Sequence, residues 1–189
     1  MPAPSGKIRI IGGSLRASRL DVPDRPGLRP TPDRVRETLF NWLMAHVGGA
    51  RCLDLYAGTG ALGIEALSRA AREVVFVERD PGLAQALRAN LERLKQTNGR
   101  VVAGDAWSAL ERETGPFDLV FLDPPFADDA WSEAARRLEL RGLLAPQAFV
   151  YVETPADAQP ELPADWHPHR EGRAGGVRHV LYRRAGGIR

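Results

Sequence analysis

From residue 51 onward, short apolar segments alternate with helix-like segments, and this alternation limits the fold more than any other feature of the chain. The apolar segments are RCLDLYAG, EVVFVERD, RVVAGDAW, FDLVFLDPPF and AFVYVETP, and a helix-like stretch follows each of the first four. Apolar strands joined by helices form a parallel sheet that is covered on both faces. The sequence therefore predicts an α/β protein, which ends in an antiparallel pair formed by WHPHRE and VRHVLYRR.

The first 50 residues have a different pattern. KIRIIGG and SLRASRLDVP predict two short strands around Gly12 and Gly13, which would form a hairpin arm. The segment TPDRVRETLFNWL then predicts a helix, with Thr31 as N-cap and Pro32 in the first helical position. We expect residues 1–28 to form a basic arm and residues 29–189 to form the main domain.

Charge is distributed unevenly along the 189 residues. Residues 1–36 contain eight Lys and Arg against three Asp, and residues 170–189 contain six Arg against one Glu, so each end carries +5. The stretch between them carries −8, and the net charge is +2. Basic ends around an acidic body are typical of a protein that holds a polyanion with its termini. Solvated arginine-rich tails with no partner would give the same pattern.

Several classes of protein are disfavoured. No apolar run approaches the ~18 residues of a membrane span, and the N-terminus MPAPSGK lacks the apolar region of a signal peptide. The single cysteine, Cys52, opens an apolar strand and cannot form a disulfide within the chain. The four histidines have no metal-ligand spacing. We therefore expect a cytoplasmic protein with no membrane association and no metal site.

A glycine loop follows the first apolar strand. Gly58, Gly60 and Gly63 match the G-x-G-x-x-G pattern of dinucleotide-binding sites, and Glu78 lies 20 residues after Gly58, where an acid that binds a ribose belongs. This pattern alone fits two cofactor classes. A nicotinamide dinucleotide places its pyrophosphate at the helix N-terminus, whereas S-adenosylmethionine has an adenosine, no phosphate and a cationic amino-acid end.

Acidic residues near the strand ends distinguish these two cofactors. Asp54 comes directly before the glycine loop, where it would repel a pyrophosphate and attract a cation. Asp105 follows the third strand and could accept from an adenine amino group, and Asp123 follows the fourth. The C-terminal ends of parallel strands form the ligand-binding edge of such a sheet. These acids favour S-adenosylmethionine over a dinucleotide.

The fourth strand ends in Asp-Pro-Pro-Phe, residues 123–126. Proline has no N–H, so Pro124 and Pro125 end the strand ladder while their carbonyl groups remain free to accept. The residue before a proline is extended, so the Asp123 carboxylate and an adjacent carbonyl can together accept from an exocyclic amino group. Phe126 can stack on the ring that carries the amine. This arrangement predicts methyl transfer to the nitrogen of a nucleobase.

Three alternatives remain open from the residues alone. A DNA adenine-N6 methyltransferase would use the same amine chemistry, although the chain has no separate segment for target recognition. An RNA-binding assembly factor without catalytic activity would keep the fold and lose turnover. A nicotinamide oxidoreductase would retain the glycine loop and would not bind S-adenosylmethionine.

The motifs together resemble the RsmD family of bacterial methyltransferases. The resemblance rests on IRIIGG, PGLRPTPDRVRETLFNWL, DLYAGTGALGIEALSRA, LDPPF and the closing HRE, AGGV and LY, and it covers nearly the whole chain. It implies a class I (Rossmann-like) seven-stranded methyltransferase sheet with an N-terminal β-hairpin extension that helps to hold RNA. It also implies methylation of a guanine N2 in small-subunit (16S) ribosomal RNA, within an assembled or partly assembled subunit. We expect the protein to act as a monomer.

The resemblance also implies roles for individual residues. The residues that would bind the cofactor are Asp54, Tyr56, Ala57, Gly58, Gly60, Glu78, Arg79, Asp105 and Ala106. Those that would bind the target guanine and promote catalysis are Asp123, Pro124, Pro125 and Phe126. The arginines of the basic arm and of the joint after it are candidates for RNA phosphate contacts, namely Arg9, Arg16, Arg19, Arg25 and Arg29. Family members commonly have Arg-Gly where this chain has Arg16 and Ala17.

Overall fold

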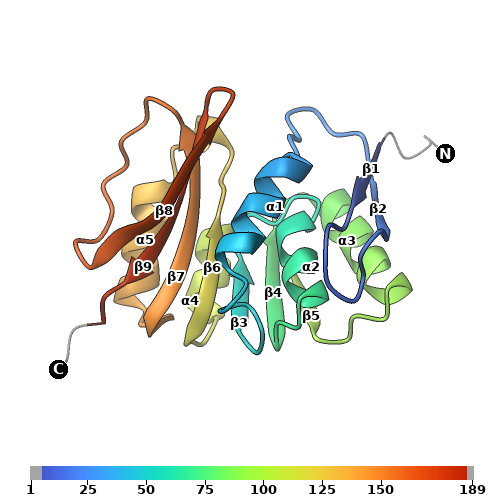
Figure 1. Ribbon diagram of the computed structural model, residues 1–189, viewed down its shortest axis with the longest axis horizontal. Coiled ribbons are helices and arrows are strands. Elements are labelled where there is room, and N and C mark those ends of the chain that lie inside the picture. Colours follow the sequence, from blue (N-terminus) through green and yellow to red (C-terminus); the bar gives the residue numbers. More distant parts are fainter. Residues whose placement is uncertain (1–5, 187–189) are drawn as a thin grey trace.

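The computed structural model describes residues 6–186 (Figure 1). Its strands are β1 (Gly6–Arg9), β2 (Arg19–Val22), β3 (Arg51–Asp54), β4 (Glu73–Glu78), β5 (Gly99–Ala103), β6 (Phe117–Leu122), β7 (Leu144–Pro155), β8 (Trp166–Ala174) and β9 (Val177–Arg184). Its helices are α1 (Asp33–Trp42), α2 (Ala61–Ser68), α3 (Pro81–Arg93), α4 (Ala106–Arg112), the 3-10 helix η1 (Phe126–Asp128) and α5 (Trp131–Leu140).

Seven strands form one sheet in the order β5-β4-β3-β6-β7-β9-β8. The first five are parallel, while β9 runs antiparallel to both of its neighbours. The predicted parallel sheet and closing antiparallel pair are confirmed. The chain winds outward from β3 to β5 and then returns to β6 on the other side of β3. Ligands of such sheets bind where the strand order reverses, at the strand C-termini, which here is the end of β3 and β6.

Helices cover both faces of the sheet, and each face has its own core (Figure 1). On one face α1, α2 and α3 pack through residues such as Phe40, Ile64 and Leu87. On the other face α4 and α5 pack through residues such as Leu110 and Leu138. The buried strands carry apolar side chains on both sides because both sides are covered.

The N-terminal hairpin, formed by β1 and β2, packs into the same core as α1 and α2. Ile8, Ile10 and Leu20 are buried there. The backbone N–H groups of Ile11 and Gly12 donate to the carboxylate of Glu65, a fully buried residue of α2. The hairpin is therefore attached to the main domain by both apolar and polar contacts.

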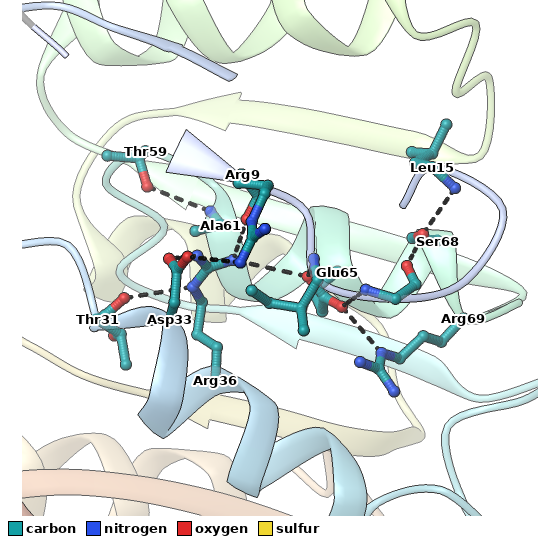
Figure 2. A network of polar contacts seen from close by, with 12 residues as sticks. Arg9, Leu15, Thr31, Asp33, Arg36, Thr59, Ala61, Glu65, Ser68 and Arg69 are labelled. Atoms are coloured by element: carbon teal, nitrogen blue, oxygen red, sulfur yellow. Dashed lines mark hydrogen bonds and ion pairs between the residues drawn. The ribbon is translucent and has the colours of Figure 1, made fainter. Parts of the chain in front are cut away.

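A network of buried charges lies beneath the hairpin (Figure 2). Arg36 of α1 has no exposed surface, and its Nη1 lies 3.6 Å from Glu65 Oε2 and donates to the carbonyl of Arg9 at 2.9 Å. Arg69 Nε donates to Glu65 Oε1 at 2.9 Å. Asp33 pairs with the other end of the Arg36 guanidinium. Every charge in this network has a hydrogen-bonded partner, as burial of a charge requires.

The start of α1 differs from the prediction. Thr31 was expected as N-cap, and this was wrong: Pro32 occupies the cap position and no side chain caps the helix. The Thr31 hydroxyl instead donates to Glu153 Oε2 at 3.2 Å across the molecule. A buried carboxylate without a hydrogen-bond donor costs more free energy than helix N–H groups that bond to water. The hydrogen bond from Thr31 to Glu153 is therefore favoured over a Thr31 cap of α1.

Within residues 6–186, no helix combines the length and apolar character that crossing a bilayer requires. The same part of the chain contains no group of three or more His, Cys, Asp or Glu side chains placed to hold a metal ion.

Candidate active site

A cleft of about 1090 Å³ opens at the C-terminal ends of β3, β4, β6 and β7. Its walls include the Pro/Gly-rich joint, residues 25–32, on one side and the β8–β9 turn, residues 174–177, on another. All residues predicted to bind the cofactor or the base line this cleft except Gly60. A volume of this size accommodates a nucleoside cofactor and a base together.

The glycine loop turns sharply between β3 and α2. Gly58 has φ +55° and Gly60 has φ +79°, a region in which side chains with a Cβ are strained. A Cβ on Gly60 would also lie 2.3 Å from Leu87 Cδ1. Both positions therefore require glycine, and the loop can approach a ligand closely.

Glu78, at the end of β4, holds the glycine loop in place. Its Oε2 accepts from the N–H of Gly58 at 2.7 Å, and its Oε1 accepts from the N–H of Asp80 at 2.8 Å. A carboxylate has about four lone-pair sites, so Glu78 can keep both backbone contacts and still accept from two ribose hydroxyls in the cleft.

Asp54, at the end of β3, is buried and accepts from the N–H of Gly63 at 3.1 Å. Burial raises the pKa of Asp54 to about 7, with the charge of Glu78 adding to the rise and the Gly63 hydrogen bond opposing it. No cation pairs with Asp54 among the described residues. A cationic ligand group in the cleft would favour the ionised form.

Asp105, Arg79 and Tyr56 lie near one another in the cleft. Asp105 caps α4, and the hydrogen bond from the N–H of Ser108 lowers the pKa of the Asp105 carboxyl. Arg79 Nη1 lies 3.0 Å from Asp128 Oδ2 of η1. The Tyr56 hydroxyl is buried without a partner among residues 6–186, and burial raises the pKa of Tyr56 to about 12.

The Asp-Pro-Pro-Phe segment continues from β6 into the cleft, as its sequence predicts. Burial raises the pKa of Asp123 well above its ordinary value, and the charge and hydrogen bond of Glu153 raise it further. Phe126 is 37% exposed, and its ring centroid lies 5.9 Å from that of Trp131. The segment thus presents an acceptor beside a partly exposed aromatic ring.

The residues of the cleft that the sequence interpretation missed include Thr31, Glu153 and His179. For Glu153 a local signal exists, because it ends the apolar run FVYVE as Glu78 ends VVFVE. For Thr31 and His179 no local pattern indicates a position in the cleft. Thr31 reaches it where its hydroxyl bonds Glu153, and His179 where β9 pairs with β7.

The five arginines predicted to contact RNA are all exposed, but only Arg25 and Arg29 line the cleft. Arg9 pairs with Asp33 at 3.6 Å, and Arg25 pairs with Asp80 at 3.5 Å. Within the described part of the chain, Arg16, Arg19 and Arg29 have no acidic partner.

Residues 8–183 match the model of a protein family described as Conserved hypothetical protein 95. The chain belongs to this family. This confirms the expected membership of the RsmD family, since relatives over the same region are named after it. The RsmD-family chain is 50% identical to Ribosomal RNA small subunit methyltransferase D of Escherichia coli (strain K12), over 95% of this chain and 91% of that protein.

Two further comparisons extend over nearly whole proteins. The chain is 42% identical to Ribosomal RNA small subunit methyltransferase D of Haemophilus influenzae, over 96% of both proteins. The solved structure of the Escherichia coli protein yhhF superposes with a TM-score of 0.88 at 48% identity and covers 96% of this chain and all of that one. The predicted Rossmann-like sheet with an N-terminal hairpin is therefore confirmed as the fold of the RsmD family.

Proposed function

We propose that this protein transfers a methyl group from S-adenosylmethionine to the exocyclic N2 amino group of a guanine in small-subunit (16S) ribosomal RNA. The observation that carries the proposal is the position of residues 123–126 in the same cleft as Asp54, Glu78 and the glycine loop. The acceptors for an amine and the residues that suit a cationic nucleoside thus line the same cleft. The names of the relatives supply the class of RNA.

The cleft fits S-adenosylmethionine on the chemistry of its donors and acceptors. Asp54 offers a carboxylate without a cation, Glu78 offers acceptor sites for ribose hydroxyls, and Tyr56 has an unpartnered buried hydroxyl. When bound, this cofactor supplies a methyl group on a cationic sulfur. Asp54, next to the glycine loop, would repel the pyrophosphate of a dinucleotide.

Residues 123–126 would promote attack by the amine. The Asp123 carboxylate and an adjacent proline carbonyl accept from the two N2 protons, while Phe126 stacks on the guanine ring. These hydrogen bonds strengthen as positive charge develops on N2, so they stabilise the transition state more than the ground state. Asp123, whose pKa is raised by burial and by Glu153, accepts the proton that N2 loses when the new N–C bond has formed.

Cofactor affinity is expected to depend on pH through Asp54. Because burial raises the pKa of Asp54 to about 7, the group is largely protonated at pH 6 and largely ionised at pH 8. Only the ionised form attracts an ammonium group, so the affinity for S-adenosylhomocysteine should rise about tenfold between these pH values. Calorimetric titration should detect proton release on binding, and Asp54→Asn should remove the pH dependence. Equal affinity of the wild type at pH 6 and pH 8 would contradict this role.

The RNA is proposed to approach across the hairpin and the joint, residues 25–32, which form one wall of the cleft. Arg16, Arg19 and Arg29 are exposed and have no acidic partner among the described residues, so their charges are available to phosphates. Each phosphate that a cation neutralises releases counterions and steepens the dependence of affinity on salt.

Replacing Arg16, Arg19 and Arg29 together by glutamine is therefore expected to weaken RNA binding and to reduce the slope of log affinity against log salt by about two to three. Filter binding of small-subunit RNA at several salt concentrations measures both quantities. Arg112→Gln is the matched control, because Arg112 is exposed at the end of α4, on the opposite face of the sheet. An unchanged slope in the triple variant would exclude the hairpin and joint as the RNA contact.

The proposed function is tested by offering labelled S-adenosylmethionine with undermethylated small ribosomal subunits, with naked small-subunit RNA and with DNA. N2-methylguanosine from the subunit or RNA supports the proposal, and the better substrate identifies the assembly state that the protein requires. N6-methyladenine in DNA would replace the substrate while keeping the amine chemistry. Binding of subunits without methyl transfer would indicate an assembly factor.

A further inference from the structure

Glu153 lies next to Asp123 at the base-binding end of the cleft. Strands β6 and β7 are parallel and pair Leu122 with Val152, so Asp123 and Glu153 occupy the following positions on neighbouring strands. Both line the cleft. The indole Nε1 of Trp131 donates to the Glu153 carbonyl at 2.7 Å and holds that backbone in place.

The Glu153 carboxylate has few partners for a buried charged group. The residue is 6% exposed; its carboxylate accepts from the Thr31 hydroxyl at 3.2 Å and lies in hydrogen-bonding range of the Asp123 carboxyl. Nearby, the Tyr151 hydroxyl and His179 Nδ1 are buried with no partner among residues 6–186. Buried polar groups are nearly always hydrogen-bonded, and exceptions cluster where a ligand completes the set. The acceptor capacity of Glu153 is therefore available to a ligand in the cleft.

We propose that Glu153 selects guanine as the target base by accepting its N1–H, while Asp123 accepts from the adjacent N2 amine. The inference rests on the proposed function and adds a specificity residue to it. Guanine presents two adjacent donors on this edge, N1–H and N2–H. Adenine presents an amine next to an N1 lone pair, which a carboxylate repels. Two neighbouring acceptors therefore match guanine and oppose adenine.

The contact between Asp123 and Glu153 also affects the protonation of Asp123. Two adjacent carboxyl groups resist simultaneous ionisation. The groups that face them are Asp54 from β3, Tyr151 from β7 and His179 from β9. Burial and the charge of Glu153 raise the pKa of Asp123 and so favour its protonated form in the free protein. Guanine offers donors to both groups, so the proton must leave when guanine binds. The kcat/KM for guanine should therefore rise with pH as Asp123 ionises.

The test uses Glu153→Gln, which keeps the shape and an acceptor but removes the negative charge. The acidic limb of the pH profile of kcat/KM should move to lower pH by about one unit or more, because Glu153 no longer raises the pKa of Asp123. A purely structural role for Glu153 would lower activity at every pH without moving the limb. Glu161→Gln, at an exposed acid after β7, should keep the wild-type profile.

A base analogue tests the N1–H contact directly. Small subunits are reconstituted with RNA that carries 2-aminopurine at the methylated position, which keeps the amine but has a bare N1 and no O6. The wild type should methylate guanine about 10- to 100-fold better than 2-aminopurine. The Glu153→Gln amide can donate to the bare N1, so its preference should be at least several-fold smaller, while loss of O6 affects both enzymes alike.

The results distinguish an error in the role of Glu153 from an error in the proposed function. A wild type that forms N2-methylguanosine, with a Glu153→Gln variant unchanged in both pH profile and base preference, would overturn the role of Glu153 and leave the proposed function intact. Absence of N2-methylguanosine with the wild type would overturn the proposed function itself.

Thermal melting and S-adenosylhomocysteine affinity verify that the Glu153→Gln variant is folded. Thr31→Val removes the hydroxyl donor to Glu153 and provides a second variant in which the Glu153 carboxylate is retained.

Discussion

Asp123→Ala is expected to lower kcat by about 10²–10³-fold while S-adenosylhomocysteine binds with near wild-type affinity. The expectation follows from removing one acceptor that acts mainly in the transition state, for which losses of this size are typical. The cofactor is proposed to contact Asp54 and Glu78 instead, and these are anchored by backbone N–H groups independently of Asp123. Single-turnover methyl transfer and calorimetric titration measure the two effects separately.

Two further variants sharpen this result. Asp123→Asn keeps a carbonyl acceptor and should lose less activity than Asp123→Ala, because the amine retains one partner. Asp129→Asn changes an exposed acid six residues away, just beyond η1, and should leave kcat unchanged. Wild-type turnover in Asp123→Ala would remove the residue from catalysis, whatever the cofactor affinity.

Arg36→Met is expected to lower the free energy of unfolding by about 3–5 kcal/mol. Arg36 and Glu65 are both fully buried, and the substitution leaves Glu65 with Arg69 as its remaining cation. The carbonyl groups of Arg9 and Thr31 also lose their donors. Urea denaturation followed by circular dichroism measures the loss.

The matched control is Arg34→Met, an exposed position on the same helix, for which a change within about 0.5 kcal/mol is expected. Adding Glu65→Met to Arg36→Met should recover part of the stability, because it removes a buried charge that has lost one of its two cations. Recovery should be incomplete, since the N–H groups of Ile11 and Gly12 then lose their acceptor. A loss below about 1 kcal/mol in Arg36→Met would show that the network contributes little to stability.

The network also links stability to function. It joins α1, α2 and the hairpin, and the joint after the hairpin forms a wall of the cleft (Figure 2). Weakening it should therefore impair RNA binding before it impairs cofactor binding, because the hydrogen-bond donors to Asp54 and Glu78 are backbone N–H groups of residues outside the network.

Local pattern was sufficient for the fold class and for the acids of the cleft. Asp54, Glu78 and Asp123 each end an apolar run, and the ends of parallel strands meet at one edge whatever the details of packing. The glycine requirement at Gly58 and Gly60 is likewise local, because it depends on φ at single residues. Helix boundaries were less well predicted, since Pro32 rather than Thr31 occupies the N-cap position of α1.

Contacts between residues far apart in the chain could not be predicted from local sequence pattern. Thr31 and Glu153 are 122 residues apart, and Ile11 and Glu65 are 54 apart. Thr31 was assigned to a helix cap because the cap preference is visible in the sequence, whereas its buried carboxylate partner is not. No local pattern marks Glu65 as the partner of Arg36, and burial alone makes their pairing obligatory.

The sequence by itself determined the parallel sheet, the glycine loop, the acids at the strand ends and the family, because each depends on residues close together in the chain. Only the tertiary structure decided that Glu153 stands beside Asp123 and that Arg36 lies beneath the hairpin. The physical reason is that strand register and burial set the distance and the solvation of these groups. Those two quantities, rather than residue type, determine the energy of a charge inside a protein.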